Sequence, residues 1–248
     1  MSRIKVAWQL LFGRPRGDTE AERLENFYKS QAESYDSTRA RILPGRQELV
    51  DKIEIPSEAV MVELGAGTGA NLEHFGDEGI KQFTKIHLVD LTPSLMDVAK
   101  KKISDNHWDN VETHLADAIT FKLDAPVDIV LFSYSLTMIP NWFAAIDNAF
   151  KILKPGGQIA VVDYYVSRRY PPKNHTRHSW LCRTFGPNMF SKNGVFPNAD
   201  LIHYLGYRFE TTERSECIAG FAGQKMIGMP YFMFTGRKPN QSGHKHEF

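Results

Sequence analysis

Three glycines at alternate positions, Gly65, Gly67 and Gly69, form the stretch of the sequence best suited to binding a small molecule. They follow an apolar run at 59–64 that predicts a buried strand. Glycines there let the backbone turn tightly and approach a ligand, and the amides that open the next helix face the same crevice. Glu63 adds an acid two residues before the first glycine. The spacing is G-x-G-x-G, which differs from the G-x-G-x-x-G of nicotinamide-binding sites.

Two more acids stand where further strands are expected to end. Asp90 lies 25 residues after Gly65, and a carboxylate at that place can accept hydrogen bonds from both hydroxyls of a ribose. Asp117 follows a third strand in the run Leu115-Ala116-Asp117-Ala118 and can accept a hydrogen bond from an adenine amino group. Because the carboxyl ends of parallel strands share one edge, these acids and the glycine turn predict a single crevice.

The elements that must position these residues alternate between strand and helix. Helical periodicity runs over 19–50 and is broken at Pro44-Gly45. The expected strands are 59–64, 85–90, 111–115, 127–132 and 158–166, with helices opening at 71 and covering 93–103 and 142–153, and with a closing antiparallel pair at 208–218 and 231–237. This order predicts an α/β fold, a Rossmann-like doubly wound sheet of seven strands, mostly parallel with an antiparallel C-terminal strand.

The expected organisation is an N-terminal helical cap at 1–52, a catalytic domain at 53–238 and a flexible tail at 239–248. Within the domain, residues 164–199 contain six cations and no acid, interleaved with aromatic residues. This basic aromatic insertion follows the fifth strand, where it is expected to form a lid over the carboxyl ends of the strands. A solvated loop whose aromatics fill a local core is the alternative.

The composition excludes several classes of protein. The 248 residues carry a net charge of +1, which argues against a nucleic-acid-binding protein. Cys182 and Cys217 are the two cysteines, too few for a disulfide framework, and they favour a reducing, cytoplasmic compartment. His175 and His178 lie near Cys182 but lack a fourth ligand in the sequence around them, so no metal site is expected.

Peripheral attachment to a membrane is suggested by the first residues of the chain. Trp8, Leu11 and Phe12 fit one apolar helical face beside Arg3 and Lys5, which is typical of an interfacial helix. A short helix packed on the protein's own surface would show the same pattern, and the sequence leaves both readings open.

Over residues 26–166 these motifs resemble the class I S-adenosylmethionine-dependent methyltransferases. The resemblance implies that S-adenosyl-L-methionine is the cofactor and S-adenosyl-L-homocysteine the product. It places the glycine turn beside the methionine part and ribose, Asp90 at the ribose, and Asp117 with Ala118 at the adenine. The implied cofactor-binding residues are Tyr35, Glu63, Gly65, Ala66, Gly67, Gly69, Asp90, Leu91, Asp117, Ala118 and Ser133.

The flanks resemble a narrower group, the diacylglyceryl-homoserine N-methyltransferases of betaine-lipid synthesis. The similar stretches include 27–28, 31–32, 35–36, 39 and 43–46 before the glycine turn, and 190–191, 207–208, 230–231 and 236–238 after it. This resemblance implies transfer of three methyl groups to a lipid-linked homoserine, giving diacylglyceryl-trimethylhomoserine. It also implies a membrane surface and a homoserine-transferring enzyme as partners. Alternatives are another amine lipid such as phosphatidylethanolamine, a quinone precursor, a soluble amine, or a non-catalytic module that only binds S-adenosylmethionine.

The chemistry of methyl transfer indicates further candidate residues for catalysis and substrate binding. Methyl transfer is an in-line displacement, so the protein chiefly aligns the groups, while a carboxylate or tyrosine oxygen orients a neutral amine and accepts its proton. Tyr28, Tyr134 and Tyr164 are the catalytic candidates, with Tyr35 and Asp163 as further candidate proton acceptors. The carboxylate of a homoserine head group would suit an arginine fork. The candidates for that fork are Arg39, Arg46 and Arg168.

Overall fold

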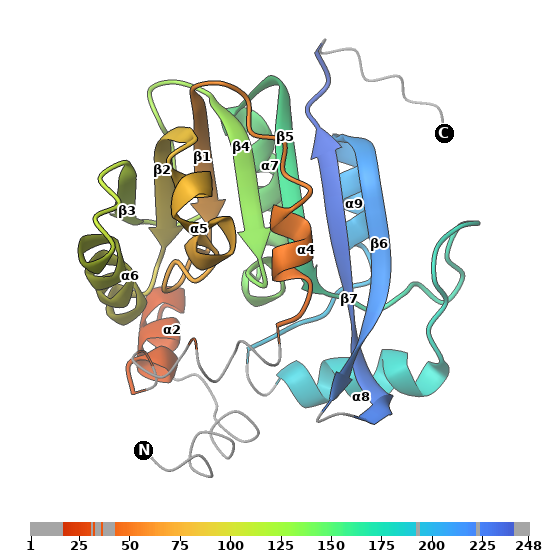
Figure 1. The fold of residues 1–248 in the computed structure, drawn as a ribbon. Coiled ribbons are helices and arrows are strands. Elements are labelled where there is room, and N and C mark those ends of the chain that lie inside the picture. The colour runs from red at the N-terminus through yellow and green to blue at the C-terminus, as the bar shows by residue number, and fades with distance from the viewer. Residues whose placement is uncertain are drawn as a thin grey trace.

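A seven-stranded sheet in the order β3-β2-β1-β4-β5-β7-β6 forms the centre of the computed structural model (Figure 1). The structure describes residues 17–30, 32, 36, 43–191, 194–221 and 224–240. Tyr35, Arg39 and the apolar segment around Trp8 therefore lie outside the described residues. The strands are β1 (Ala59–Leu64), β2 (Phe83–Asp90), β3 (Val111–Leu115), β4 (Val127–Ser133), β5 (Leu153–Tyr164), β6 (Glu210–Phe221) and β7 (Gln224–Arg237).

Strands β1 to β5 pair in parallel, while β7 runs antiparallel to both β5 and β6. The expected Rossmann-like doubly wound sheet, with one strand running opposite to the rest, is confirmed. The closing hairpin is longer than the sequence pattern predicted, because β6 continues to Phe221 and β7 begins at Gln224. Its tip extends beyond the last pairing of β5, Tyr164 with Tyr231.

Helices cover both faces of the sheet. They are α2 (Glu20–Tyr28), α4 (Arg46–Val50), α5 (Leu72–Ile80), α6 (Pro93–Asp105), α7 (Trp142–Ile152), α8 (Trp180–Ser191) and α9 (Leu201–Arg208), with the short 3₁₀ helix η2 (Leu136–Met138). One buried cluster joins α7 and α9 to the sheet, and the other joins α4, α5 and α6 to the opposite face. Apolar packing on both faces is what a parallel sheet requires, since its strands leave neither face to water.

The arrowheads of β1, β2 and β4 point to one edge of the sheet, and α2 and α8 lie at that same edge (Figure 1). Helix α2 begins with a capping box, in which Thr19 accepts a hydrogen bond from the amide of Glu22 and the Glu22 side chain binds back. Phe27 and Tyr28 are the buried residues of α2. They pack with Leu95 of α6 and so bring α2 to the carboxyl ends of the strands.

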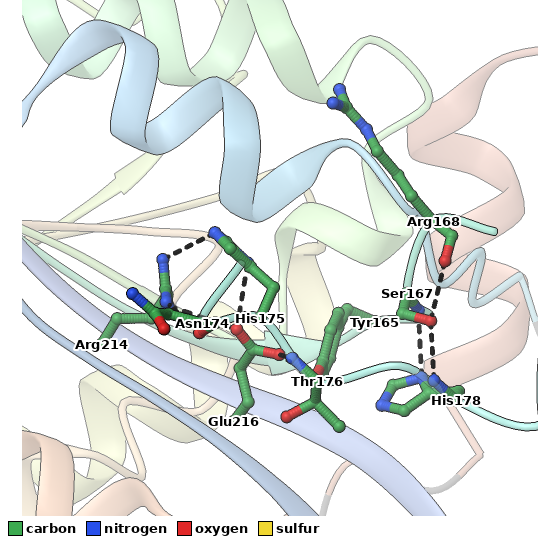
Figure 2. Close-up of polar contacts among 9 residues, drawn as sticks. All are labelled: Tyr165, Ser167, Arg168, Asn174, His175, Thr176, His178, Arg214 and Glu216. Atoms are coloured by element: carbon green, nitrogen blue, oxygen red, sulfur yellow. Dashed lines mark hydrogen bonds and ion pairs between the residues drawn. The ribbon is translucent and has the colours of Figure 1, made fainter. Parts of the chain in front are cut away.

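The basic aromatic insertion is anchored to β6 through one buried acid (Figure 2). The Oε2 atom of Glu216 accepts hydrogen bonds from the hydroxyl of Tyr165 (2.9 Å) and the amide of Thr176 (2.7 Å). Its Oε1 atom lies 3.1 Å from Nδ1 of His175 and 3.2 Å from Nε of Arg214. A segment without acids is thus held by an acid supplied from a distant strand.

A second pair closes the loop before α8. The amide of Ser167 donates to Nδ1 of His178 (3.0 Å), and the amide of His178 donates to Oγ of Ser167 (2.8 Å). Arg168 points away from this pair in Figure 2 and forms an ion pair with Asp200, at 2.7 Å, just before α9. The insertion therefore packs against β6 and α9 and has an ordered framework of its own.

Candidate functional site

A cavity of about 250 Å³ opens at the carboxyl edge of β1, β2 and β4. Its walls come from the glycine turn, the segments after β2, β3 and β4, and the inner side of α2. Of the residues predicted from the sequence, the cavity is lined by Tyr28, Arg46, Gly65, Ala66, Gly67, Asp90, Leu91, Asp117, Ala118, Ser133 and Tyr134. The topology therefore brings together residues that are more than 100 positions apart in the chain.

The glycine turn is fixed by backbone hydrogen bonds. The amides of Gly65 and Ala66 both donate to the carbonyl of Val89, at 2.8 and 3.0 Å. Gly65 has a φ of +76°, and a Cβ atom there would lie 2.4 Å from Cβ of Ser135, so no larger residue fits. Gly67 has a φ of +57°, but its hypothetical Cβ would meet only Leu95, at 3.8 Å. Gly67 thus keeps the wall of the cavity free of a side chain.

Asp90 is held in place by the turn that it faces. Its Oδ2 atom accepts the amide of Gly67 and its Oδ1 atom the amide of Thr92, both at 2.9 Å. Burial raises the pKa of this carboxyl, and the amide hydrogen bonds oppose the rise. Each carboxylate oxygen can accept a second hydrogen bond, so the group can still bind two hydroxyls of a ligand.

Glu63 lies behind the turn and does not line the cavity. It is buried, and its Oε1 atom accepts a hydrogen bond from Asn71, whose own oxygen accepts the hydroxyl of Ser133. The Oε2 atom has no partner among the described residues. Burial raises the pKa of Glu63 to about 7. Glu63 therefore supports the cavity wall through Asn71 and Ser133 instead of facing a ligand.

The loop after β3 forms the opposite wall. The amide of Ile119 donates to Oδ1 of Asp117, at 2.8 Å. Buried Asn148 of α7 donates to the carbonyls of Ala118 and Phe121, at 2.8 and 2.9 Å. These bonds hold Asp117 and Ala118 at the cavity, where the resemblance placed an adenine.

The tyrosine candidates occupy different places. Tyr28 lines the cavity and donates its hydroxyl to Sδ of Met138, at 3.0 Å. Tyr134 also lines it, but its hydroxyl donates to the carbonyl of Pro44, and burial raises its pKa. A phenol with a raised pKa and a donated proton is a poor base, so Tyr134 offers the cavity its ring. The prediction for Tyr164 needs correction, because this side chain lies behind Tyr134, at 4.7 Å between ring centroids, and does not line the cavity.

Asp163 also lies away from the cavity. It is fully buried and accepts the hydroxyl of Thr137 at 2.6 Å and the amides of Thr137 and Tyr164. Burial raises its pKa to about 6. Its role is to join β5 to η2, which leaves no direct path for it to accept a proton from a substrate.

Of the arginine candidates that the structure describes, one lines the cavity and one does not. Arg46, at the start of α4, lines the cavity with its guanidinium 5.8 Å from the ring centroid of Tyr134. Its Nε atom is buried without a hydrogen-bond partner among the described residues. Arg168 is committed to Asp200 and does not line the cavity, so the geometry does not support its prediction as a substrate ligand. None of the described residues of the expected lid, 164–199, lines the cavity either.

Several residues that matter to the site gave no signal in the sequence. Asp36 accepts hydrogen bonds from the hydroxyl of Thr68 and, at 2.9 Å, from Nζ of Lys102, which also pairs with Glu73 at 2.7 Å. This connection joins the N-terminal region to the glycine turn. Glu20 of α2, 70 positions before Asp90, contributes a carboxylate to the cavity. These pairs come from separate elements, so no local spacing could have indicated them.

Comparison with known proteins agrees with this geometry. A family described as a methyltransferase domain matches residues 62–159. A tRNA N(3)-methylcytidine methyltransferase from Schizosaccharomyces pombe is 29% identical over 56% of this chain and 48% of its own length. The chain thus spans about half the length of that relative.

Two solved structures share the fold. N-methyltransferase NodS from Bradyrhizobium japonicum, solved with S-adenosylhomocysteine, has a TM-score of 0.65 at 16% identity and covers 87% of this chain and 98% of its own. A phosphoethanolamine N-methyltransferase from Haemonchus contortus, solved with phosphomonomethylethanolamine and S-adenosylhomocysteine, has a TM-score of 0.68 at 15% identity. That match covers 90% of this chain and 61% of the other.

The chain therefore carries an S-adenosylmethionine-dependent methyltransferase domain. Its residues fit the cofactor: Gly67 leaves the wall open, Asp90 presents a fixed carboxylate, and Asp117 stands across the cavity. When bound there, S-adenosylmethionine supplies an activated methyl group, so the remaining task of the protein is to position an acceptor.

Proposed function

We propose that the protein is an N-methyltransferase that adds three methyl groups to the amine of diacylglyceryl-homoserine to give diacylglyceryl-trimethylhomoserine. The observation that carries this proposal is Arg46, a partly unpaired guanidinium beside the ring of Tyr134 at the wall of the cofactor cavity. The resemblance of the flanking motifs to the betaine-lipid enzymes supplies the identity of the lipid.

Arg46 suits the carboxylate of a homoserine head group. A guanidinium presents several N–H donors in a fixed plane and binds a carboxylate through two parallel hydrogen bonds. Arg46 lines the cavity and forms no ion pair among the described residues, so an incoming carboxylate would supply the opposite charge that it lacks. The site should therefore prefer an acceptor that carries a carboxylate close to its amine.

The rings of Tyr28 and Tyr134 suit the other end of the head group. Each methylation moves the amine toward a quaternary ammonium, and aromatic faces bind such cations with about 0.5–2 kcal/mol each. The two tyrosines line the same cavity as Arg46. A site that binds both the substrate amine and its methylated forms can act repeatedly on one lipid.

Glu20 is our assignment for the group that orients the amine. It is the carboxylate at the cavity besides Asp90 and Asp117 among the described residues, and its side chain is one-third exposed. Its carboxylate contacts Arg23 at 2.8 Å, and it can accept a hydrogen bond from the substrate amine and pass the proton of that amine to water. This residue replaces Tyr134 and Tyr164 in the role that the sequence had assigned to them.

A membrane surface is the expected source of the lipid. Helix α8 exposes Trp180, Leu181 and Phe185, by 65%, 58% and 63%. Nearby, exposed Tyr170 lies between the guanidiniums of Arg169 and Arg177, at 5.4 and 5.7 Å from the ring centroid. Exposed aromatics beside cations that form no ion pair among the described residues suit an anionic bilayer, where each basic side chain contributes about 1 kcal/mol.

These residues support peripheral attachment at the cytoplasmic face, with α8 at the same edge of the sheet as the cavity (Figure 1). Among the residues that the structure describes, no helix is long and apolar enough to cross a bilayer. The homoserine-transferring enzyme, which would make the acceptor, is the expected partner on that surface.

Lipid analysis in cells tests the acceptor. Cells that co-express the protein with a homoserine-transferring enzyme should accumulate diacylglyceryl-trimethylhomoserine, detected by mass spectrometry of the lipid extract. The matched control is Asp90→Ala, which should leave unmethylated diacylglyceryl-homoserine. If soluble, folded protein yields no methylated form of this lipid, or instead methylates phosphatidylethanolamine, a quinone precursor or a soluble amine, the proposed acceptor is wrong.

A further inference from the structure

A second constellation of ligand-forming side chains lies away from the cofactor cavity, on strands β2 and β3. His87 of β2 faces His114 of β3, with Nδ1 of His87 and Nε2 of His114 separated by 2.9 Å. Glu112 of β3, the register partner of His87, places its Oε1 atom 3.9 Å from Nε2 of His114. One ligand atom from each of the three residues lies within 4.8 Å of the others.

The spacing of these atoms is close to that of a metal site. Two imidazole nitrogens bound at about 2.0–2.1 Å to one ion lie about 2.9–3.4 Å apart at bond angles between about 90° and 110°. The separation of the two histidine nitrogens already falls at the short end of that interval. The carboxylate oxygen lies farther out, 3.9 Å from Nε2 of His114 and within 4.8 Å of both nitrogens, and the exposed Glu112 side chain must rotate to reach the ion.

Neighbouring residues orient two of the three ligands, Glu112 and His114. Lys85 forms an ion pair with Oε2 of Glu112, at 3.1 Å, and leaves Oε1 on the side of the histidines. The ring of His114 packs against Phe121, with 5.0 Å between centroids, and against the ring of His87 at 5.1 Å. Such supporting contacts fix the direction of metal ligands and raise affinity.

We infer that His87, His114 and Glu112 form a binding site for one divalent transition-metal ion, with Zn²⁺ as the best match. Two imidazoles and one carboxylate are a donor set that Zn²⁺ accepts, with water in the fourth position. Binding requires the hydrogen that lies between the two rings to move to the outer nitrogen of its own ring. This is a change of tautomer and releases no net proton.

The site would act on the stability of the edge strand. Strand β3 is the last strand at its end of the sheet and runs directly into the cofactor loop at Ala116, Asp117 and Ala118. An ion held by residues of β2 and β3 joins the two strands through their side chains. Since Phe121 contacts His114 and its carbonyl is held by Asn148, the ion also supports the far end of that loop.

The test uses the full chain and Zn²⁺ itself. Because His244 and His246 stand in the C-terminal tail and can bind metal without a built site, the parent protein for all measurements carries H244N and H246N. Isothermal titration should give one Zn²⁺ per chain. At a Zn²⁺ concentration about 100 times the Kd, the melting temperature should rise by about 5–10 °C.

Three variants locate the site. His87→Asn and His114→Asn should each abolish the thermal shift, and Glu112→Gln should weaken binding about 10-fold or more. His107→Asn, on an exposed turn, is the matched control and should behave as the parent. A thermal shift that survives His87→Asn or His114→Asn, or the absence of stoichiometric binding by the parent, overturns the inference.

Because the variants could lose metal binding by misfolding, a further measurement uses the parent protein, in which all three proposed ligands are intact. In the parent labelled with ¹⁵N-histidine, Co²⁺ at one equivalent should broaden the imidazole signals of two histidines, His87 and His114, and leave the others sharp. Broadening of other imidazoles instead, or of none, contradicts the site.

Discussion

The cofactor crevice and the basic aromatic insertion are held together in opposite ways. In the crevice, most of the hydrogen bonds that fix the site involve backbone amides. The amides of Gly67 and Thr92 donate to Asp90, and the amides of the glycine turn donate to the carbonyl of Val89. In the insertion, one side chain from the distant strand β6, Glu216, holds Tyr165, His175 and Thr176. A site built on backbone geometry leaves a short sequence signature, whereas one built on distant side chains does not.

The largest expected effect falls on the crevice. Asp90→Ala removes a charged acceptor, and hydrogen bonds to charged groups contribute about 1.5–3 kcal/mol. Affinity for S-adenosylmethionine should fall about 10–100-fold in calorimetric titrations. Gly67→Val should cost at least as much, because a β-branched side chain resists the φ of +57° and enters the cavity. Asp97→Ala, on the exposed side of α6, is the control and should bind normally. If Asp90→Ala binds S-adenosylmethionine as tightly as the parent does, the assignment of Asp90 to the ribose is wrong.

Part of the pH dependence of stability should trace to Glu63, beside a contribution of the same sign from Asp163. The pKa of Glu63 is raised to about 7 in the folded protein, above the usual value of 4.5, so the folded state holds a proton that the unfolded state releases. This contribution is fully present below about pH 4.5 and is lost as the pH rises through 7. The expected loss is about 3 kcal/mol at most, measured by urea unfolding between pH 5 and 8. Glu63→Gln should flatten this decline, and a decline as steep as that of the parent would contradict the assignment.

Substitution of Arg46 tests the acceptor side of the cavity. Arg46→Ala should raise the KM for diacylglyceryl-homoserine about 10-fold, because a charge-assisted contact to the carboxylate is lost. The Kd for S-adenosylmethionine should stay within about 2-fold of the parent. Arg168→Ala is the control, since that side chain pairs with Asp200 outside the cavity. Equal KM values for the two variants would show that Arg46 does not bind the substrate carboxylate.

The smallest effect is expected at the membrane surface. Replacement of Trp180, Leu181 and Phe185 by serine should reduce co-flotation with anionic vesicles by several-fold, while S-adenosylmethionine affinity is retained. Phe143→Ser removes an apolar side chain of similar exposure from α7 and should float as the parent does. The first residues of the chain must be present, because the segment around Trp8 was also predicted to bind membranes. If neither the parent nor the triple variant floats, the surface assignment is wrong.

The sequence was sufficient for the crevice because each of its signals is local. Gly65, Gly67, Asp90 and Asp117 stand at strand ends, and parallel strands bring such ends to one edge. Sequence spacing could not show that Tyr164 lies behind Tyr134 or that Arg168 is taken by Asp200. Those outcomes depend on how the insertion and β6 pack, which no short motif describes.

Other positions were missed for the same reason. Glu20 reaches the cavity only because α2 packs against α6, and Asp36 meets Thr68 and Lys102 only in the folded chain. The pairing of His87 with His114 likewise needs the register of β2 against β3, which the strand pattern alone leaves open.

The most direct test of the proposed function is methyl transfer by the purified protein. Vesicles containing diacylglyceryl-homoserine and anionic lipid are incubated with methyl-labelled S-adenosylmethionine, beside matched vesicles that contain phosphatidylethanolamine as the amine lipid and beside free homoserine. Mono-, di- and trimethylated diacylglyceryl-homoserine should form in succession, with at least 10-fold less label in the other acceptors and none with Asp90→Ala. Label in the other acceptors at equal or higher rates, or binding of S-adenosylmethionine without any transfer, would contradict the proposed function.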